Sequence, residues 1–416
     1  MRGHSPARPP WLEHYNRFVD MREGEMNIKR GEKLMNPIRV LIITGSMDVG
    51  GIENQLMHLL RNADKSKFQI DFTTTMEHPF YKDEIESLGG KCVRIPATDG
   101  RHFYRQCKAL YNIMKDGQYD IVHSHELFHS GMVLLTAKLA GVKHRFVHAH
   151  NWSDDDGSGR KCIVRRVYNS VMRRWILRYG TDFCACSTLA GKFLYGEKKL
   201  HDANYHLIFN SVDTAKFIDN YDRHESGEFC DNGWTNVIQV GRFSAVKNQL
   251  FTAQIANEFK RRGKKIRILC AGNNGGEYEE RVREKIKQLG VEDYMLLLGV
   301  RKDIDTLMRK SSAFLLPSLY EGMPLVMIEA QAAGLPCVTA DTYSREVDYN
   351  IGYVQWLQLA KSAAEWADAV ERAVDMGRAD KSAVVNAIEK YGFDSRVFAN
   401  RLCELYEQAM RSGERA

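Results

Sequence analysis

The segment Leu315–Gly334, with the sequence LLPSLYEGMPLVMIEAQAAG, combines the residue types in this chain that are best suited to ligand chemistry. Two carboxylates stand eight positions apart in it. Glu321 is expected in a loop after a strand, and Glu329 about one turn inside a helix that begins near Leu325. Both side chains can therefore point into one cleft. The alternative is purely structural, with Glu321 capping the helix and Glu329 lying on the surface.

The loop that joins this strand to this helix is suited to an anion. Gly322 lets the backbone approach a ligand closely, because it has no side chain. Pro324 presets the first helical turn, where its missing N–H costs nothing. The amides of that turn, at the positive end of the helix dipole, form a site suited to a diphosphate.

A second cluster of polar groups follows another strand, in the segment Val240–Asn248 (VGRFSAVKN). Arg242 offers a planar fork of donors and Lys247 a point charge, a combination suited to phosphate oxygens. Charge builds on a leaving diphosphate as its bond breaks, so two cations at this place could replace a metal ion.

In the first half of the chain, Gly50 and Gly51 precede a helix expected over Ile52–Leu60. Paired glycines before a helix allow a phosphate or a sugar to approach the backbone. Glu53 could contact a substrate or satisfy the helix dipole, and the sequence leaves both interpretations open.

Two histidine pairs follow strands, His123 with His125 and His148 with His150, the latter just before Asn151. Four histidines could suggest a metal ion. Both pairs are spaced i, i+2, however, and no carboxylate stands at a convincing ligand spacing. The sequence therefore predicts no metal site, and any one of these histidines is more often a core or loop residue.

The elements that must position these groups alternate between short apolar runs and amphipathic stretches. This alternation predicts α/β architecture with parallel sheets and right-handed crossovers. In open sheets of this kind, ligands bind beyond the carboxyl ends of the strands. The expected strands are Ile38–Thr44, Phe68–Thr73, Lys91–Ile95, Ile121–His123, His144–His148, Asp182–Ala185, Val237–Val240, Ile266–Ala271, Tyr294–Leu298, Ala313–Pro317 and Cys337–Thr339.

A length of 416 residues is too great for one ordinary core, and it favours two domains. The polar segment Asp219–Asn236 is a good linker between them. The expected parts are a disordered tail (1–36), a Rossmann-like domain (37–218), a linker (219–236), a second Rossmann-like domain (237–390) and a C-terminal helix (391–416) packing back on the first domain. The tail has no apolar h-region and is not expected to be a signal peptide. The alternative is that it is upstream sequence, with the true start at Met26 or Met35.

Taken together, these motifs resemble those of a known family. Residues 37–412 are similar to family-four retaining glycosyltransferases of the GT-B fold, a group that contains bacterial exopolysaccharide, capsule and phosphatidylinositol mannosyl transferases. Its E-x7-E pattern matches Glu321 and Glu329, and its G-R-x4-K pattern matches Arg242 and Lys247. The resemblance implies two Rossmann-like βαβ domains that face each other across a cleft. The first, 37–218, would be the acceptor domain, and the second, 237–390, the nucleotide-sugar donor domain.

The resemblance also implies roles for individual residues. Arg242 and Lys247 would bind the donor diphosphate, and Glu329 would hold the ribose hydroxyls. The catalytic group would contain Glu321 on the transferred sugar and His125 near its C6 hydroxyl. Further donor-side residues would be Gly50, Gly51, Gly322, Met323, Pro324 and Leu325, and the acceptor-side residues would be His150 and Asn151. No protein nucleophile or base is assigned.

The expected reaction is transfer of a sugar from a nucleotide-diphosphate donor, with a UDP-sugar favoured over GDP-mannose. The acceptor would be a saccharide or a lipid-linked saccharide in cell-surface polysaccharide synthesis. The nucleotide-sugar is a co-substrate, and neither a metal nor another cofactor is expected. Two alternatives remain: a nucleotide-sugar 2-epimerase of the same fold, which needs no acceptor, and a non-catalytic nucleotide-sugar-binding protein.

Composition agrees with a cytoplasmic protein. Apolar residues make up 44% and charged residues 27%, and no run approaches the roughly 18 apolar residues of a membrane span. Nine cysteines without zinc-like spacing fit a reduced compartment. The absence of GxGxxG and Walker A sequences weakens dehydrogenase and P-loop kinase assignments. Asp154–Asp156 resembles a D-x-D metal motif, but it follows no strand and is expected to be a solvated turn.

The net charge of +6 is mild but unevenly distributed. Residues 157–181 contain seven basic and no acidic side chains, with apolar residues at helical spacing. Such a helix could rest peripherally on the anionic inner face of the plasma membrane, or it could be a core-facing helix with a solvated basic face. One basic helix without a recognition motif gives no support for a nucleic-acid partner.

Overall fold

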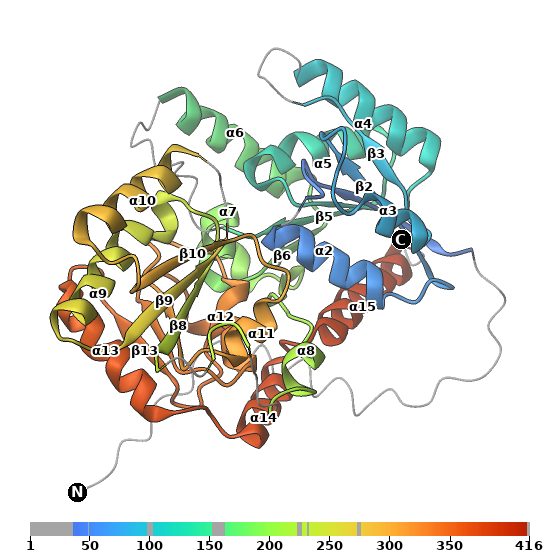
Figure 1. Ribbon diagram of the computed structural model, residues 1–416. Helices are drawn as coiled ribbons and strands as arrows, with labels where there is room; N and C mark the ends of the chain where they lie inside the picture. Colours follow the sequence, from blue (N-terminus) through green and yellow to red (C-terminus); the bar gives the residue numbers. More distant parts are fainter. Residues whose placement is uncertain are drawn as a thin grey trace, which may run out of the picture. The chain divides into compact units, whose positions relative to one another are not determined.

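A computed structural model of the protein describes residues 36–48, 50–97, 103–151, 163–222, 227–230, 233–272 and 276–413 (Figure 1). The segment Ile38–Ala416 forms one compact unit. Most of the predicted N-terminal tail and Asp154–Asp156 lie outside the described residues. Among the described helices, none combines the length and the apolar character that crossing a bilayer requires.

The first half of the unit is built on a seven-stranded sheet with the order β3-β2-β1-β4-β5-β6-β7, and all of its neighbouring strands run parallel. Its first strand, IRVLII, is apolar except for Arg39, and its last four residues are buried, as expected of a strand that is covered on both faces. The strands are β1 (Ile38–Ile43), β2 (Phe68–Thr74), β3 (Cys92–Arg94), β4 (Ile121–Ser124), β5 (His144–Ala149), β6 (Asp182–Ala185) and β7 (Tyr205–Leu207).

The second half is built on a six-stranded parallel sheet with the order β10-β9-β8-β11-β12-β13. The α/β prediction with parallel sheets is therefore confirmed. Its strands are β8 (Thr235–Val240), β9 (Ile266–Ala271), β10 (Met295–Gly299), β11 (Ala313–Leu316), β12 (Cys337–Ala340) and β13 (Val354–Leu357).

Eleven of the strands were predicted from apolar runs, and two were missed. The missed strands, β7 and β13, each lie at one edge of a sheet. They are only three and four residues long, and most of their side chains are half-buried. Short edge strands carry a mixed YHL or VQWL pattern rather than a continuous apolar run, so periodicity gives no signal for them.

Within each sheet, the helices α2–α7 and α9–α12 lie between successive parallel strands. The predicted helix at Ile52–Leu60 corresponds to α2, and the predicted C-terminal helix within residues 391–416 corresponds to α15. The α-helices of the described residues are α2 (Gly51–Asn62), α3 (Lys82–Ser87), α4 (Phe103–Gly117), α5 (Ser130–Leu139), α6 (Ile163–Tyr179), α7 (Thr188–Tyr195), α8 (Ala215–Ile218), α9 (Gln249–Arg261), α10 (Glu277–Leu289), α11 (Ile304–Arg309), α12 (Leu325–Ala332), α13 (Ala363–Met376), α14 (Lys381–Tyr391) and α15 (Ser395–Gly413).

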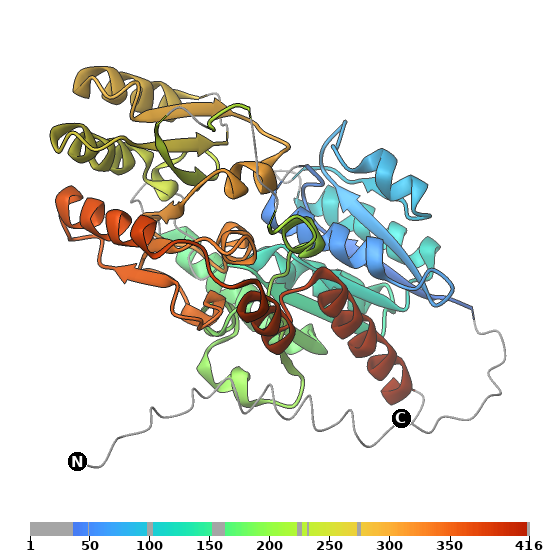
Figure 2. The ribbon, with the colours of Figure 1, turned by 60° about the horizontal axis from the view of Figure 1, so that its bottom comes forward.

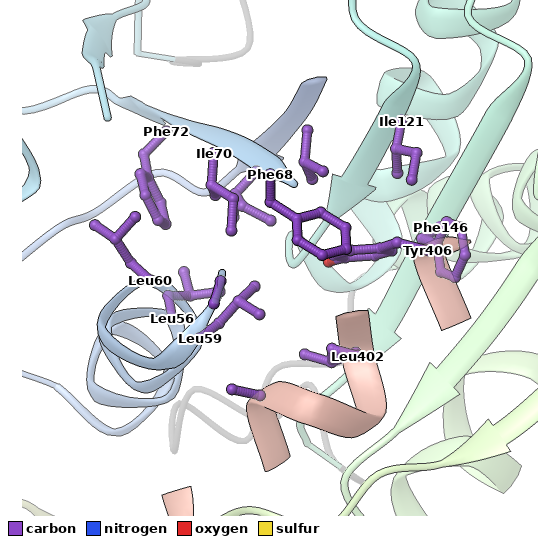
Figure 3. Packing of buried hydrophobic residues seen from close by; sticks show 14 of the residues in the cluster. Leu56, Leu59, Leu60, Phe68, Ile70, Phe72, Ile121, Phe146, Leu402 and Tyr406 are labelled. Atoms are coloured by element: carbon purple, nitrogen blue, oxygen red, sulfur yellow. The ribbon is translucent and has the colours of Figure 1, made fainter. Parts of the chain in front are cut away.

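The core of the first half includes residues from the end of the chain. Helix α15 lies beside α2 (Figures 1 and 2), and its Leu402 and Tyr406 join the cluster of buried residues under β1 and β2 (Figure 3). The Tyr406 hydroxyl also lies 2.7 Å from Nδ1 of His123 in β4. The last helix is therefore part of the first sheet's hydrophobic core.

The second sheet has a separate core in which α9 and α13 contribute large side chains. Trp366 of α13 is fully buried and packs edge-on against Phe251 of α9. Helix α13 begins with a capping box, in which Ser362 and Glu365 satisfy each other's backbone amides. This core supports the strands β8 and β11, from whose ends the candidate site extends.

Candidate active site

The predicted site residues come directly after the two central strands of each sheet, from which successive strands are added in opposite directions. In the first sheet the chain proceeds outward in opposite directions from β1 and β4, and in the second from β8 and β11. Such switch points are where open parallel sheets bind ligands, because the loops after the two central strands diverge. Gly50 and His125 follow the first pair of strands, and Lys247 and Glu321 follow the second.

Lys247 and Glu321 form an ion pair at the second switch point. The Lys247 Nζ lies 2.6 Å from Glu321 Oε1, and the two side chains are only 18% and 13% exposed. The Lys247 stem passes under Gly241, whose φ of +152° and missing Cβ leave room for it. The two predicted motifs, 74 residues apart, therefore meet in one charge pair.

Arg242 is exposed, and its charge acts on Glu53 of the first half. Burial raises the pKa of Glu53, whereas hydrogen bonds to its own amide and to Ser46 and the nearby Arg242 charge lower it. The Glu53 carboxylate folds back over Gly50, where an added Cβ would lie 2.3 Å from Oε2. This position at the start of α2 matches the helix-dipole interpretation of Glu53.

The loop before α12 touches the loop after β5 directly. A Cβ on Gly322 would lie 1.9 Å from the His150 carbonyl oxygen and 3.3 Å from the Asn151 Oδ1. The side chain of Asn210 donates a hydrogen bond of 2.8 Å to the Met323 carbonyl. In this structure the space above Gly322 is therefore taken by backbone of the first half.

The start of α12 also faces the first half. A Cβ on Gly51 would lie 3.6 Å from Cδ1 of Leu325, which is ordinary contact. Pro324 is the N-cap, with φ −70° and ψ 116°, so it stands one position before the first helical turn in which the sequence analysis placed it. Helix α12 begins at Leu325 as predicted.

Glu329 lies on α12 and is partly buried. Desolvation raises its pKa to about 7, and the nearby Lys216 charge opposes this shift. A carboxylate held in this way benefits from hydrogen-bond donors such as ligand hydroxyls, because they stabilise its charged form.

The two histidine pairs form a single buried cluster. Strands β4 and β5 are neighbours, and residues spaced i, i+2 point to the same face of a sheet, so all four rings meet. Nδ1 of His125 lies 2.7 Å from Nε2 of His150, and the His148 and His150 rings are stacked with centroids 4.4 Å apart. Burial lowers the pKa of His150 to about 4 and those of His123, His125 and His148 well below 6.5, so these imidazoles are neutral at pH 7.

Neutral imidazoles are also the form that binds metals. Ligand atoms of His125, His148 and His150 all lie within 4.8 Å of one another, as do those of His123, His148 and Cys184. The spacing of the four histidines predicted no metal site, whereas the structure brings the two pairs together in sets with the donor types that suit a transition metal. Neither set contains a carboxylate.

Comparisons with known proteins agree on one family. The family model described as Glycosyltransferase Family 4 matches residues 49–216, and the one described as Glycosyl transferases group 1 matches residues 230–390. The putative glycosyltransferase EpsF of Bacillus subtilis (strain 168) is 34% identical over 375 residues, which cover 88% of this chain and 96% of that protein. The chain belongs to the family-four glycosyltransferases.

Two further similarities support the fold and the family. The capsular polysaccharide biosynthesis glycosyltransferase CapH of Staphylococcus aureus is 28% identical over 70% of this chain and 78% of its own. The crystal structure of Anabaena HepE in complex with UDP and glucose superposes with a TM-score of 0.69 at 15% identity, covering 89% of this chain and 99% of that one. This family-four glycosyltransferase therefore has the GT-B fold that the resemblance implied.

Two carboxylates of this family-four glycosyltransferase were not predicted as site residues. Glu126, next to His125, faces a cavity in the first half. Glu346 is 8% exposed and accepts hydrogen bonds from the amide and hydroxyl of Thr188, 158 residues away in the chain. The position of Glu126 directly after a strand-end histidine was an available signal, whereas nothing in the sequence connects Glu346 with Thr188.

The basic helix predicted over residues 157–181 is α6, and residues 157–162 lie outside the described part of the chain. Its first two turns expose apolar side chains, with Ile163 76%, Val164 73% and Val167 59% exposed. Arg173, by contrast, donates hydrogen bonds to the carbonyls of Phe193 and Leu194 and is part of the fold. The face of α6 around Ile163, Val164 and Val167 is thus not packed on the described core.

Proposed function

We propose that this protein is a retaining, metal-independent glycosyltransferase that moves a sugar from a UDP-sugar to a saccharide or lipid-linked saccharide in cell-surface polysaccharide synthesis. The observation that carries the proposal is the Lys247–Glu321 pair at the second switch point, next to the start of α12. It brings together a phosphate-binding cation, a sugar-binding carboxylate and a helix N-terminus.

In the proposed complex, Arg242 and Lys247 bind the donor diphosphate together with the first-turn amides of α12. Lys247 then serves two partners, the diphosphate and Glu321, and it holds Glu321 toward the sugar. Glu329 accepts hydrogen bonds from the ribose hydroxyls, which offset the desolvation that now raises its pKa to about 7. HepE, in complex with UDP and glucose, supports UDP as the nucleotide.

The proposed chemistry needs no protein nucleophile. The bond between the sugar C1 and the phosphate oxygen breaks, and its electron pair leaves with the diphosphate. The acceptor hydroxyl attacks C1 from the same face, and its proton passes to an oxygen of the departing diphosphate. Arg242 and Lys247 stabilise the charge that develops there. Glu321 and Glu329 are not a glycosidase pair, because Glu321 is committed to Lys247 and both would serve as donor ligands.

Metal independence follows in this proposal from the cation pair, since two positive side chains meet the diphosphate charge directly. The histidine cluster is a different kind of candidate metal site, because its imidazole nitrogens and the Cys184 sulfur do not suit the Mg²⁺ that usually accompanies nucleotide diphosphates. A histidine-bound transition metal is the competing arrangement, and a chelator separates the two.

A lipid-linked acceptor is supported by α6. Its exposed apolar residues stand among Arg165, Arg166 and Arg174, the pattern of a helix that lies on an anionic membrane surface. We place the enzyme peripherally on the cytoplasmic face of the membrane, where lipid-linked saccharides can be extended. CapH, which acts in capsular polysaccharide biosynthesis, supports the polysaccharide role.

The test is calorimetric titration of UDP and of GDP in EDTA, using wild type, Arg242→Ala/Lys247→Ala, and Arg283→Ala/Lys361→Ala as a control for the loss of two exposed cations. We expect micromolar UDP binding that only the first variant loses. Survival of binding in that variant would refute the diphosphate assignment. Loss of wild-type binding in EDTA, restored by a divalent ion, would refute metal independence.

Catalysis is tested by nucleotide release from UDP-glucose with and without acceptors. A transferase releases UDP in proportion to the acceptor. A 2-epimerase of the same fold turns over its donor without one, and a binding protein releases none. Release that does not depend on any acceptor would contradict the proposed activity.

A further inference from the structure

The four histidines at the first switch point are buried, yet several of their ring nitrogens have no hydrogen-bond partner among the described residues. These nitrogens are Nε2 of His123, Nε2 of His125 and both nitrogens of His148. Buried polar atoms are normally paired, because an unpaired one keeps the cost of desolvation without a compensating contact. Several unpaired nitrogens in one place therefore indicate a ligand that binds imidazoles.

Three of the rings, those of His125, His148 and His150, are grouped as a metal site requires. Each offers a ligand nitrogen, and the three nitrogens lie within 4.8 Å of one another. Zinc bonds to imidazole nitrogens at about 2.0–2.1 Å in tetrahedral geometry, so its ligand nitrogens stand roughly 3.4 Å apart. Three histidines with an open fourth position are an arrangement that proteins use for zinc. The spacing therefore fits such an ion after a small movement of the side chains.

The contact between His125 and His150 shows where the ion would lie. Nδ1 of His125 and Nε2 of His150 face each other at 2.7 Å, with one proton between them. A zinc ion would take the place of that proton, and the two nitrogens would move apart by less than about 1 Å. A proton displaced from Nδ1 of His125 moves to Nε2 of the same ring, so both imidazoles remain neutral ligands.

A second set of donors in the same cluster combines nitrogens of His123 and His148 with the Cys184 sulfur. His123 and Cys184 are 0% exposed, whereas His125 and His150 are 7% and 8% exposed. A metal site needs an entry path for the ion. The set that contains His125 and His150 has such a path, from the side where the loops after β4 and β5 lie, and it is the better candidate.

We propose that His125, His148 and His150 form a binding site for a divalent transition metal ion such as zinc, and that the bound ion inhibits transfer. The ion would take His125 away from the donor sugar, whereas Arg242 and Lys247 in the second half would still bind the diphosphate. Transfer is therefore lost while UDP affinity is retained. The metal site stands on the histidine cluster alone. Its inhibitory effect rests on the proposed transferase function, in which the reaction itself needs no metal.

Metal binding is measured first, without nucleotide or acceptor, on the full chain prepared without a histidine tag. Zinc is titrated by calorimetry, and cobalt is the second probe because tetrahedral cobalt sites absorb visible light strongly. His148→Leu removes one ligand and breaks no hydrogen bond of its ring among the described residues. His150→Gln is a second ligand variant. His78→Leu and His201→Leu, which change exposed histidines, are the controls.

We expect wild type to bind one zinc ion per chain with a micromolar or tighter Kd. Both ligand variants should bind zinc about 100-fold more weakly or worse, since even an outer partner of a metal ligand is worth about 10–100-fold in affinity. The two controls should match wild type. No binding by wild type, or unchanged affinity in both ligand variants, would overturn the site. If the ligand variants do not fold, the weak absorption of octahedral cobalt in wild type would overturn it.

Inhibition is then measured as acceptor-dependent UDP release from UDP-glucose, with each rate divided by the rate of the same variant in EDTA. Stoichiometric zinc should remove most of the transfer by wild type and His78→Leu, and EDTA should restore it, while UDP affinity stays unchanged. His148→Leu should keep its own rate in zinc. Equal inhibition of wild type and His148→Leu would overturn the inhibitory role. Failure of wild type to bind UDP or to transfer in EDTA would overturn the proposed function and the inhibition with it, whereas the metal site, measured without nucleotide, would stand.

Discussion

The two switch points hold different kinds of chemistry. The second has opposite charges that are already paired, Lys247 with Glu321, in loops that the sequence motifs marked. The first has neutral imidazoles and a carboxylate, Glu126, that lacks a cationic partner among the described residues. A charged, preorganised site suits a diphosphate, whose binding is dominated by electrostatics. A neutral, partly desolvated site suits sugar hydroxyls, which are recognised through hydrogen bonds.

The largest expected effect comes from removing the Lys247 charge at the second switch point. Lys247→Met should weaken UDP binding on the order of 100-fold, because a charge-assisted contact worth about 1.5–3 kcal/mol is lost and Glu321 is left unpaired. Titration of UDP measures it. Glu321→Gln should weaken UDP binding less than tenfold, since it removes a sugar ligand and not a phosphate ligand. Equal losses in the two variants would mean that the pair is only structural.

The next effect concerns the contact between the two regions. Gly322→Ala should reduce transfer by about 100-fold, because its Cβ would lie 1.9 Å from the His150 carbonyl and force the two loops apart. Gly377→Ala, at the end of α13 and away from the site, is the control, since its Cβ would meet no other atom of the described residues within 4 Å. Initial rates of UDP release and circular dichroism of both variants check the result. Wild-type rates in Gly322→Ala would show that this contact opens during turnover.

A smaller effect uses the pH dependence of stability. The pKa of Glu329 is raised to about 7 in the fold from its ordinary value of 4.5, so the folded state binds this proton more tightly than the unfolded state. Stability is therefore lost as pH rises from about 4.5 to 7. Glu329→Gln should stabilise the apo protein at pH 8 by about 2 kcal/mol and have little effect near pH 4.5.

Urea unfolding of wild type and Glu329→Gln at pH 4.5 and pH 8 measures whether the substitution raises or lowers the free energy of unfolding. The same variant should bind UDP more weakly, which separates its effect on stability from its role in the site. A destabilised Glu329→Gln at pH 8 would contradict the assignment of its raised pKa to desolvation.

The smallest expected effect concerns the proposed contact of α6 with an anionic membrane. Arg166→Gln should reduce binding to vesicles that contain phosphatidylglycerol by about fivefold, since one basic residue near an anionic surface contributes about 1 kcal/mol. Arg372→Gln, exposed on α13, is the control. Co-sedimentation measures both variants. Arg173 is unsuitable for this purpose because it holds the carbonyls of Phe193 and Leu194. An absence of wild-type binding would refute the membrane contact.

The same contrast explains what the sequence could predict. Two short motifs mark the second switch point, because each places its residue, Lys247 or Glu321, in a loop directly after a strand; the ion pair between them, across 74 positions, was not predicted. The central strands were equally clear, because their apolar runs are buried on both faces. These features depend on neighbours in the chain.

The remaining features depend on partners that are far apart in the sequence. The histidine cluster joins His125 to His150 only because β4 and β5 pair in register, and Thr188 reaches Glu346 over 158 positions. Glu126 faces a cavity only because residues of α4 and α5, such as Leu110 and Val133, line the same space. No local pattern encodes such distances, and the half-buried edge strands β7 and β13 were missed for a similar reason.

The packing of α15 against α2 and β2 has a consequence for synthesis of the chain. Ribosomes release the first sheet long before they release Ser395–Gly413, so the nascent first half must wait with part of its apolar surface uncovered. Among the described residues, the core cluster around Trp366 in the second half contains none from α15, so this half can close its own core earlier. The half that is made first is thus the half that finishes folding last, and truncation of the final helix would leave it dependent on chaperones.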